Sequence, residues 1–211
     1  MSDKKKLSLL ANLGVKAMRG MAKITQGYDP IFLGEMVNLL GFSGLTEWSE
    51  KLQGVADAAE ARFGVIDAQV LISFAAMLNG CRVCSVGHMY VANLHYFDET
   101  GGLFPIDERE VYDLQALEDE VLFQTLEERL EGERFDNVRR LLDRIYDLKF
   151  RGAEVADADD EHLEGLIGVW DLLSECTIVQ DITDASQIEP LTTIAKNKDL
   201  IRRYQAARGR S

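Results

Sequence analysis

Proline is scarce in this sequence, with three among 211 residues. No two alternating apolar and polar runs are joined by a short turn, which is the pattern of a β-hairpin. Leu, Ala, Glu, Asp and Arg are abundant, and 46% of the residues are hydrophobic, which is enough for a sizeable core. These features predict an all-α fold. The length fits one large domain, and we expect a single domain over residues 1–211.

The sequence also lacks a secretory signal and a membrane span. Its start, "MSDKKKLSLLANLG", is charged, but the apolar run that follows is short and interrupted by polar residues. No apolar stretch approaches the length that crosses a bilayer. We therefore expect a cytoplasmic protein with no membrane partner. Persistent structural disulfides are rare in that compartment, so neighbouring cysteines there indicate redox chemistry or metal binding.

Positive charge is in short supply, since the formal net charge is −13, which argues against binding to nucleic acid. Residues 98–136 carry fourteen acidic side chains and three arginines. The first twenty-four residues carry six basic side chains against Asp3, and the tail from Lys196 carries six against Asp199. We expect a solvated acidic face with basic termini. The alternative is that the basic ends lie against the acidic middle of the same or a neighbouring subunit.

Helical patterns begin near the N-terminus. Residues 7–23 predict a basic amphipathic helix with Leu10, Leu13, Ala17 and Met21 near one face. We expect this helix to pack on its own domain as an N-terminal arm, and contact with a membrane or a partner is the alternative.

Glycines mark the ends of the next helices. Residues 31–40 predict a short helix that ends at Gly41. The following helix has Thr46 as its expected N-cap and ends at Gly64.

The next segment is different, because residues 66–78 are apolar almost all round and so predict a central, buried helix. Asn79-Gly80 ends it. A second helix is expected from about Cys81 to Phe97, so that the two helices form an antiparallel hairpin.

The rest of the chain is expected to add helices at residues 107–130, 135–152, 157–182 and 189–208. The first is acidic, the third begins with an acidic capping cluster, and the last is basic. The domain would then consist of a core at about residues 45–97 and an extended C-terminal half of additional helices at about residues 107–208.

The stretch "LNGCRVCSVGHMYVANLHY" holds two of the three cysteines and two of the three histidines. On a helix, residues three and four apart share a face, so Cys81, Cys84 and His88 form one stripe. His95 lies roughly 10 Å beyond His88 along the helix, too far to contact the thiols. We expect His95 to be a packing or surface residue.

Asn79-Gly80 places both cysteines in the first turn of the helix. Free backbone N–H groups and the helix dipole stabilise an anion there, and the thiolate is the reactive form of cysteine. An imidazole one turn beyond Cys84 can take the thiol proton and return it to a leaving group. Two thiols in one turn can also close a disulfide. The arrangement indicates a peroxide-reducing or disulfide-exchanging site.

Two other interpretations stay open. The cysteines can be neighbours without a function, because cysteine is among the most buried residue types. Cys81, Cys84 and His88 could also bind zinc, with Cys176 as a fourth ligand. However, CxxC pairs in zinc sites usually come twice, and this sequence has no second pair. We therefore expect no bound metal, and we expect Cys176 to be a buried bystander.

Residues 69–94, "QVLISFAAMLNGCRVCSVGHMYVANL", resemble the AhpD-like superfamily, which includes carboxymuconolactone decarboxylases and alkylhydroperoxidases. The shared pattern is an apolar helix, Asn-Gly, CxxC and a histidine four residues later. The resemblance implies an all-α fold that commonly assembles as a trimer or hexamer. It also implies that Cys84 is the peroxidatic cysteine, Cys81 the resolving cysteine and His88 the histidine of a proton relay.

Two positions depart from the family pattern. The relay glutamate usually lies twelve residues before the first cysteine, where this sequence has Gln69. A relay histidine can precede the second cysteine, and this sequence has Val83 there. Glutamine cannot exchange a proton as a carboxylate does, but it can orient His88 by a hydrogen bond. Gln69 and Ser73 lie one turn apart on an apolar helix, so they either line the site or form a satisfied structural pair.

The sequence therefore predicts a thiol-dependent peroxidase or disulfide oxidoreductase that reduces hydroperoxides. It would use no cofactor beyond the redox-active disulfide, and an external dithiol protein or a small thiol would reset it. The alternatives are a non-catalytic helical protein that senses oxidation or binds zinc, and a decarboxylase-like enzyme of the same fold. We expect core packing, rather than a pocket lining, for Tyr90, Phe97, Trp170 and Met89.

Overall fold

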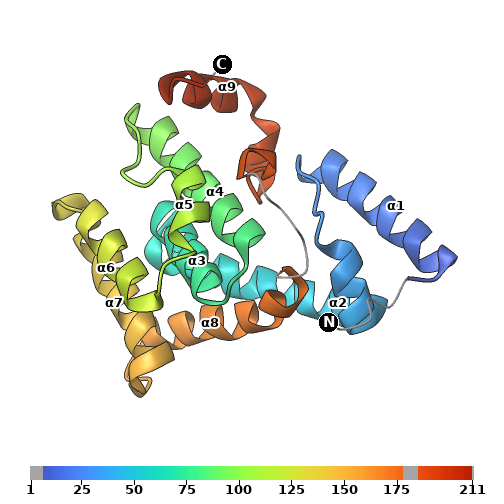
Figure 1. Cartoon of the computed structure of the whole chain (residues 1–211), viewed down its shortest axis with the longest axis horizontal. Helices are drawn as coiled ribbons and strands as arrows, with labels where there is room; N and C mark the ends of the chain where they lie inside the picture. The colour runs from blue at the N-terminus through green and yellow to red at the C-terminus, as the bar shows by residue number, and fades with distance from the viewer. Residues whose placement is uncertain (1–6, 178–184, 211) are drawn as a thin grey trace.

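The fold is all-α, as predicted. The computed structural model describes residues 7–177 and 185–210, with the backbone alone for residues 171–177. These residues form helices and connecting turns, without strands (Figure 1). None of the described helices combines the length and the apolar character that crossing a membrane requires.

A helical hairpin, α3 and α4, lies at the centre of the molecule (Figure 1). α3 spans Val65–Leu78 and is almost entirely buried, as its uniformly apolar sequence predicted. α4 spans Arg82–Thr100. Gly80 has a φ of +75°, a conformation that glycine adopts readily, and it allows the tight reversal between the helices. α4 extends past its predicted end to Gly101, which caps it in the left-handed conformation.

α2, Leu33–Phe63, is one long helix bent at Gly41. Gly41 has a φ of +70°, so the predicted break at this glycine is present as a kink. The prediction that Thr46 is an N-cap is wrong. Its hydroxyl donates to the carbonyl of Phe42 within the helix, because the helix resumes directly after the kink. Gly64 ends α2 as predicted, and α3 follows at once.

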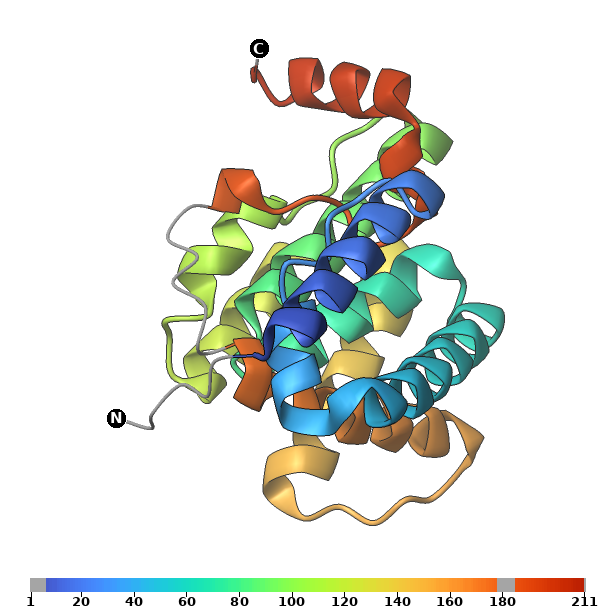
Figure 2. The ribbon, with the colours of Figure 1, turned by 90° about the vertical axis from the view of Figure 1, so that its right-hand side faces the viewer.

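α1, Leu9–Thr25, lies at the right-hand edge of the molecule in Figure 1 and in front of the other helices in Figure 2. The helix itself was predicted, and the face that carries Leu10, Leu13, Ala17 and Met21 is exposed. Leu10 is 82% exposed and Met21 is 66% exposed. Val15, on the opposite side of the helix, is buried instead. α1 therefore packs on its own domain as expected, through the face that carries Val15 and Met18.

The acidic helix predicted after residue 107 is two helices, α5 at Glu108–Leu114 and α6 at Asp119–Arg129. Gln115 accounts for the break. Its Oε1 accepts from the hydroxyl of Ser85 at 3.1 Å, and its Nε2 donates to a carbonyl near the end of α3 at 3.4 Å. These bonds tie the end of α5 to the α3–α4 corner, so the chain changes direction there.

The next segments contain a 3-10 turn and two helices with a π-helical turn between them: η1 Glu133–Phe135, α7 Asp136–Tyr146, η2 Asp147–Arg151 and α8 Ala158–Thr177. Both α helices were predicted, and the predicted end of the second lies outside the described residues. The acidic cap of α8 is also present, since Asp157 accepts the backbone N–H of Asp160 at 3.0 Å.

The basic helix predicted for residues 189–208 is shorter than expected. Two 3-10 turns come first, η3 at Ala185–Gln187 and η4 at Thr193–Lys196, and α9 covers Lys198–Ala207. α9 starts after Asn197, whose side chain accepts a backbone N–H of the first turn at 3.1 Å.

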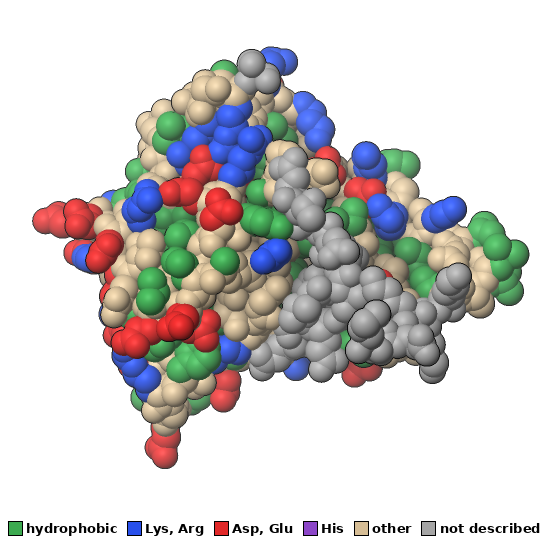
Figure 3. Space-filling view, in the orientation of Figure 1, with side chains coloured by type: hydrophobic (Ala, Val, Ile, Leu, Met, Phe, Trp, Pro, Cys, Tyr) green, Lys and Arg blue, Asp and Glu red, His purple; other side chains and the backbone are tan. Residues whose placement is uncertain are grey.

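The basic C-terminal tail lies against the acidic middle of its own chain. Arg210 forms ion pairs with Asp107 and with Glu108, the second at 2.5 Å. Arg203 lies 3.6 Å from Asp98. Figure 3 shows basic and acidic side chains gathered together at the α9 end of the molecule. For the tail, the expectation of a purely solvated basic terminus is wrong, because these contacts pair it with acidic groups.

Candidate redox site

The two cysteines lie at the α3–α4 corner, as their spacing from Asn79-Gly80 predicted. Cys81 is the N-cap of α4, and its sulfur accepts the backbone N–H of Cys84 at 3.2 Å. Their Cα atoms are 5.4 Å apart, and a disulfide joins the two sulfurs. The positive end of the helix dipole therefore acts on the sulfur of Cys81.

His88 lies one turn beyond Cys84 on α4. Its Nδ1 is 2.7 Å from Oε1 of Gln69 on α3, which is the hydrogen bond expected from the hairpin. Its ring also contacts the indole of Trp170 on α8, with centroids 5.3 Å apart. Burial lowers the pKa of His88 to about 3, so the imidazole is neutral at pH 7 when the cysteines are joined.

Gln69 is hydrogen-bonded at both ends of its amide. Its Nε2 donates to Oε1 of Glu60 on α2 at 2.7 Å, while its Oε1 faces His88. Gln69 thus connects His88 to a carboxylate that the sequence analysis missed. Glu60 and Gln69 lie on opposite sides of Gly64, each within about one and a half helical turns of it. Pairing residues across this glycine corner is the signal that could have identified Glu60.

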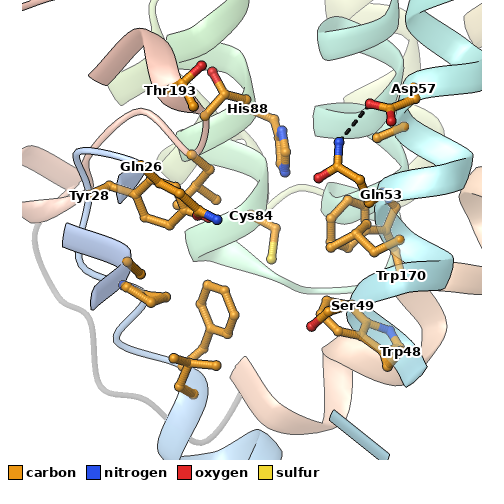
Figure 4. Close-up of a pocket in the computed structure, with 18 of the residues that line it drawn as sticks. Gln26, Tyr28, Trp48, Ser49, Gln53, Asp57, Cys84, His88, Trp170 and Thr193 are labelled. Carbon is orange, nitrogen blue, oxygen red and sulfur yellow. Dashed lines mark hydrogen bonds between the residues drawn. The ribbon is translucent and has the colours of Figure 1, made fainter. Parts of the chain in front are cut away.

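The side chains of Cys84, His88, Gln69 and Glu60 line one cavity of about 450 Å³. In Figure 4 the imidazole of His88 and the sulfur of Cys84 point into this space. Much of the wall is aromatic or aliphatic: Tyr28, Phe32, Leu33, Leu45, Trp48, Leu52, Trp170 and Leu191. Cys81 is fully buried and is not part of the lining. The cavity therefore offers an apolar molecule access to one sulfur of the pair.

Other predicted residues lie away from this cavity. The hydroxyl of Ser73 donates to the carbonyl of Ser85 at 2.7 Å, so Ser73 is structural while Gln69 lines the site. His95 is half-buried and does not line the cavity. Burial lowers the pKa of His95, and Glu60 acts on it in the opposite direction. The side chain of Cys176 lies outside the described residues.

The four aromatic and sulfur-containing residues expected in the core divide into two groups. Tyr90 and Phe97 pack against Tyr204, and Met89 is fully buried. Trp170 is buried in the core as expected, and its indole also lies beside His88 and forms part of the cavity wall.

Within the described part of the chain, no group of three or more His, Cys, Asp and Glu side chains is placed to hold a metal ion. The predicted zinc alternative includes Cys176, so it stays a prediction.

Comparison with known proteins found no matching family model, no matching curated protein and no matching solved structure. The resemblance to the AhpD-like superfamily therefore depends on residues 69–94 alone.

Proposed function

We propose that the protein is a thiol-dependent peroxidase that reduces hydroperoxides, with Cys84 as the attacking thiol. One observation carries the proposal: Cys84 and His88 line the same largely apolar cavity, and Cys81 lies within disulfide distance of Cys84. The resemblance of residues 69–94 to AhpD-like proteins supports the same assignment.

His88 can act as a base because of the bond at its other ring nitrogen. Nδ1–H donates to Oε1 of Gln69, which leaves the lone pair on Nε2. That nitrogen can take the proton of the reduced Cys84 thiol. The resulting thiolate stabilises the imidazolium, which opposes the effect of burial on the pKa of His88.

The reaction then has two steps. The Cys84 thiolate attacks the terminal oxygen of the hydroperoxide, the O–O bond breaks, and Cys84 becomes a sulfenic acid. The departing alkoxide takes the proton from His88 and leaves as an alcohol. Cys81 next attacks the sulfur of Cys84, and the displaced hydroxide takes up the Cys81 proton and leaves as water. An external dithiol supplies two electrons and two protons to restore both thiols.

Burial and hydrogen bonding support different roles for the two cysteines. Cys84 lines the cavity, where a peroxide and a reductant can reach it, whereas Cys81 does not. The backbone N–H that bonds the sulfur of Cys81 favours its thiolate. Cys81 is therefore suited to attack Cys84 after oxidation and to leave when a reductant attacks Cys84.

The test is consumption of cumene hydroperoxide by the reduced protein with a dithiol reductant. We expect Cys84→Ser to abolish consumption. Cys81→Ser should allow one turnover and leave a sulfenic acid on Cys84 that a dimedone probe labels, and Cys176→Ser should behave like the wild type. No consumption by the wild type, or labelling of Cys81 in Cys84→Ser, would contradict the proposal. Stoichiometric zinc in freshly purified protein would favour the zinc-binding alternative.

A further inference from the structure

A chain of hydrogen bonds joins three helices along the wall of the cavity. Glu60 of α2 accepts from Nε2 of Gln69 on α3, and Oε1 of Gln69 meets Nδ1 of His88 on α4, both at 2.7 Å. All three side chains also line the cavity that contains Cys84. We propose that Glu60 is a positioning residue, which fixes the His88 tautomer needed to deprotonate Cys84. This inference rests on the proposed function, since it takes His88 as the base.

The orientation of the Gln69 amide decides which nitrogen of His88 carries the hydrogen. An amide has a donor end and an acceptor end, and either end can face an imidazole. A carboxylate only accepts, so Glu60 holds the NH₂ end of Gln69 and turns the oxygen toward His88. Nδ1 of His88 must then carry the hydrogen, and Nε2 keeps its lone pair.

Loss of Glu60 would remove this constraint. The amide of Gln69 could then turn over and donate to Nδ1 of His88. The ring hydrogen would move to Nε2, and a protonated Nε2 cannot accept the proton of the Cys84 thiol.

The charged groups around the chain identify Glu60 as the carboxylate involved. Asp57 lies one turn earlier on α2, but it accepts from Gln53 at 2.6 Å, as the dashed line in Figure 4 marks. The charge of Glu60 also raises the pKa of His95 on α4. Of these carboxylates, Glu60 is the one that bonds to Gln69.

The tautomer of His88 is the first measurement. The chain has three histidines, so ¹⁵N-labelled histidine gives a simple NMR spectrum in which ring shifts separate Nδ1–H from Nε2–H. We expect Nδ1–H in the disulfide form of the wild type, where the imidazole of His88 is neutral at pH 7. We expect a substantial Nε2–H population in Glu60→Leu, where the acceptor is gone. Retention of a pure Nδ1–H form in Glu60→Leu overturns the proposal.

The rate of Cys84 oxidation by cumene hydroperoxide is the second measurement. Glu60→Leu should lower this rate by about 10-fold, part of a complete general-base contribution. Glu60→Gln should lower the rate less than Glu60→Leu does, because its amide oxygen can still accept from Gln69. Glu50→Leu, at an exposed carboxylate of the same helix, is the matched control and should leave the rate unchanged. Equal rates in Glu60→Leu and Glu50→Leu would contradict the proposal.

Rescue separates positioning from a purely structural role. A carboxylate at position 69 has no donor end, so it accepts from His88 without help from Glu60. Gln69→Glu should therefore raise the rate of Glu60→Leu back toward that of the wild type. In the wild type the same change sets two carboxylates against each other and one must keep a proton, so the gain there should be smaller.

A folded Glu60→Leu/Gln69→Glu protein that is no faster than Glu60→Leu would refute the positioning role. The tautomer measurement needs no peroxide, so it tests the positioning role of Glu60 separately from the peroxidase activity. If the wild type consumes no peroxide while the tautomer shifts in Glu60→Leu, the proposed function fails and the control of His88 by Glu60 stands.

Discussion

At the scale of single residues, His88 is both buried and required to bind a proton during the proposed reaction. In the disulfide form no thiolate faces it, and burial lowers its pKa to about 3. In the proposed reaction a Cys84 thiolate would face His88, and its charge would favour the imidazolium and raise the pKa of His88. We therefore expect the redox state of the cysteines to control how readily His88 takes up a proton.

We predict that the disulfide form loses stability as the pH falls from 7 to 5. An unfolded histidine has a pKa of about 6.5, whereas folded His88 stays neutral down to about pH 3. The unfolded state binds more protons throughout this window, so the free energy of unfolding falls with pH, by about 2 kcal/mol between pH 6.5 and 5. Chemical denaturation without reductant measures this loss.

The variant His88→Asn should show a weaker pH dependence, and His162→Asn serves as its control. The lowered pKa of His95 contributes in the same direction in all of these proteins, so the difference between them isolates His88. The same slope in the wild type and in His88→Asn would show that the imidazole is not held neutral.

The sequence predicted the residues of this site that lie on one helix. Cys81, Cys84 and His88 share a face because helical spacing fixes their relative positions. Gln69 was expected opposite His88 from the hairpin, and the hydrogen bond between them is present. Glu60 was not predicted, because its contact depends on how sharply α2 turns into α3, and a residue pattern does not set that angle.

At the scale of elements, one wall of the cavity depends on a glycine in α4. The backbone N–H of Leu191 donates to the carbonyl of Gly87 at 3.4 Å where the segment after η3 crosses α4. A Cβ at Gly87 would lie 2.3 Å from Cγ of Leu191 and 3.2 Å from the carbonyl oxygen of Glu189. Because Gly87 has no side chain, Leu191 and the two threonines after it can approach α4 and line the cavity.

Gly87→Ala is therefore expected to destabilise the protein by about 1–3 kcal/mol, the usual cost of overpacking. It should also change the KM for cumene hydroperoxide more than that for hydrogen peroxide, because the displaced wall contacts the larger molecule. Gly54→Ala in α2 is the control, since nothing lies within 4 Å of the added Cβ. That change should stabilise by about 0.5–1 kcal/mol. Urea denaturation measures both changes. If the two variants shift the free energy of unfolding in the same direction, this explanation is wrong.

Patterns in the sequence predicted where helices exist better than where they end. The uniformly apolar α3 and the end of α2 at Gly64 were predicted because local composition decides them, whereas α2 was expected as two helices and is one bent helix. The end of α5 depends on bonds from Gln115 to the α3–α4 corner, which a local pattern cannot show. The buried face of α1 is likewise set by the rest of the molecule, and the sequence analysis made no prediction of it.

At the scale of the whole molecule, the cavity is built from segments that are far apart in the chain. Met18 of α1, Trp48 of α2, Trp170 of α8 and Leu191 all contribute to its wall. Such a site could not be predicted from the sequence, because it depends on how separate helices pack together. The trimer or hexamer implied by the resemblance stays a prediction.

The C-terminal end of the molecule is held by a buried carboxylate. Glu108 of α5 is 2% exposed and accepts from Nδ2 of Asn93 at 2.9 Å, from the hydroxyl of Tyr204 and from Arg210 at 2.5 Å. Burial, together with the charge of Glu108, raises the pKa of Tyr204 and keeps its hydroxyl a donor. Glu108 of α5 therefore connects α4, α9 and the residue Arg210 that follows α9.

Arg210→Ala should destabilise the protein by about 3 kcal/mol, because it leaves the buried carboxylate of Glu108 without its cation. Arg202→Ala is the control, since its ion pair with Asp199 is exposed, at 76% and 61% for the two side chains, and should cost about 0.5 kcal/mol or less. Glu108→Gln combined with Arg210→Ala should recover part of the loss, because the amide oxygen can still accept from Asn93 or Tyr204 and carries no charge. Urea denaturation of the three variants measures these differences. If Arg210→Ala lowers the free energy of unfolding no more than Arg202→Ala does, Arg210 is not needed to stabilise the charge of Glu108. The hydrogen bonds from Asn93 and Tyr204 are then sufficient.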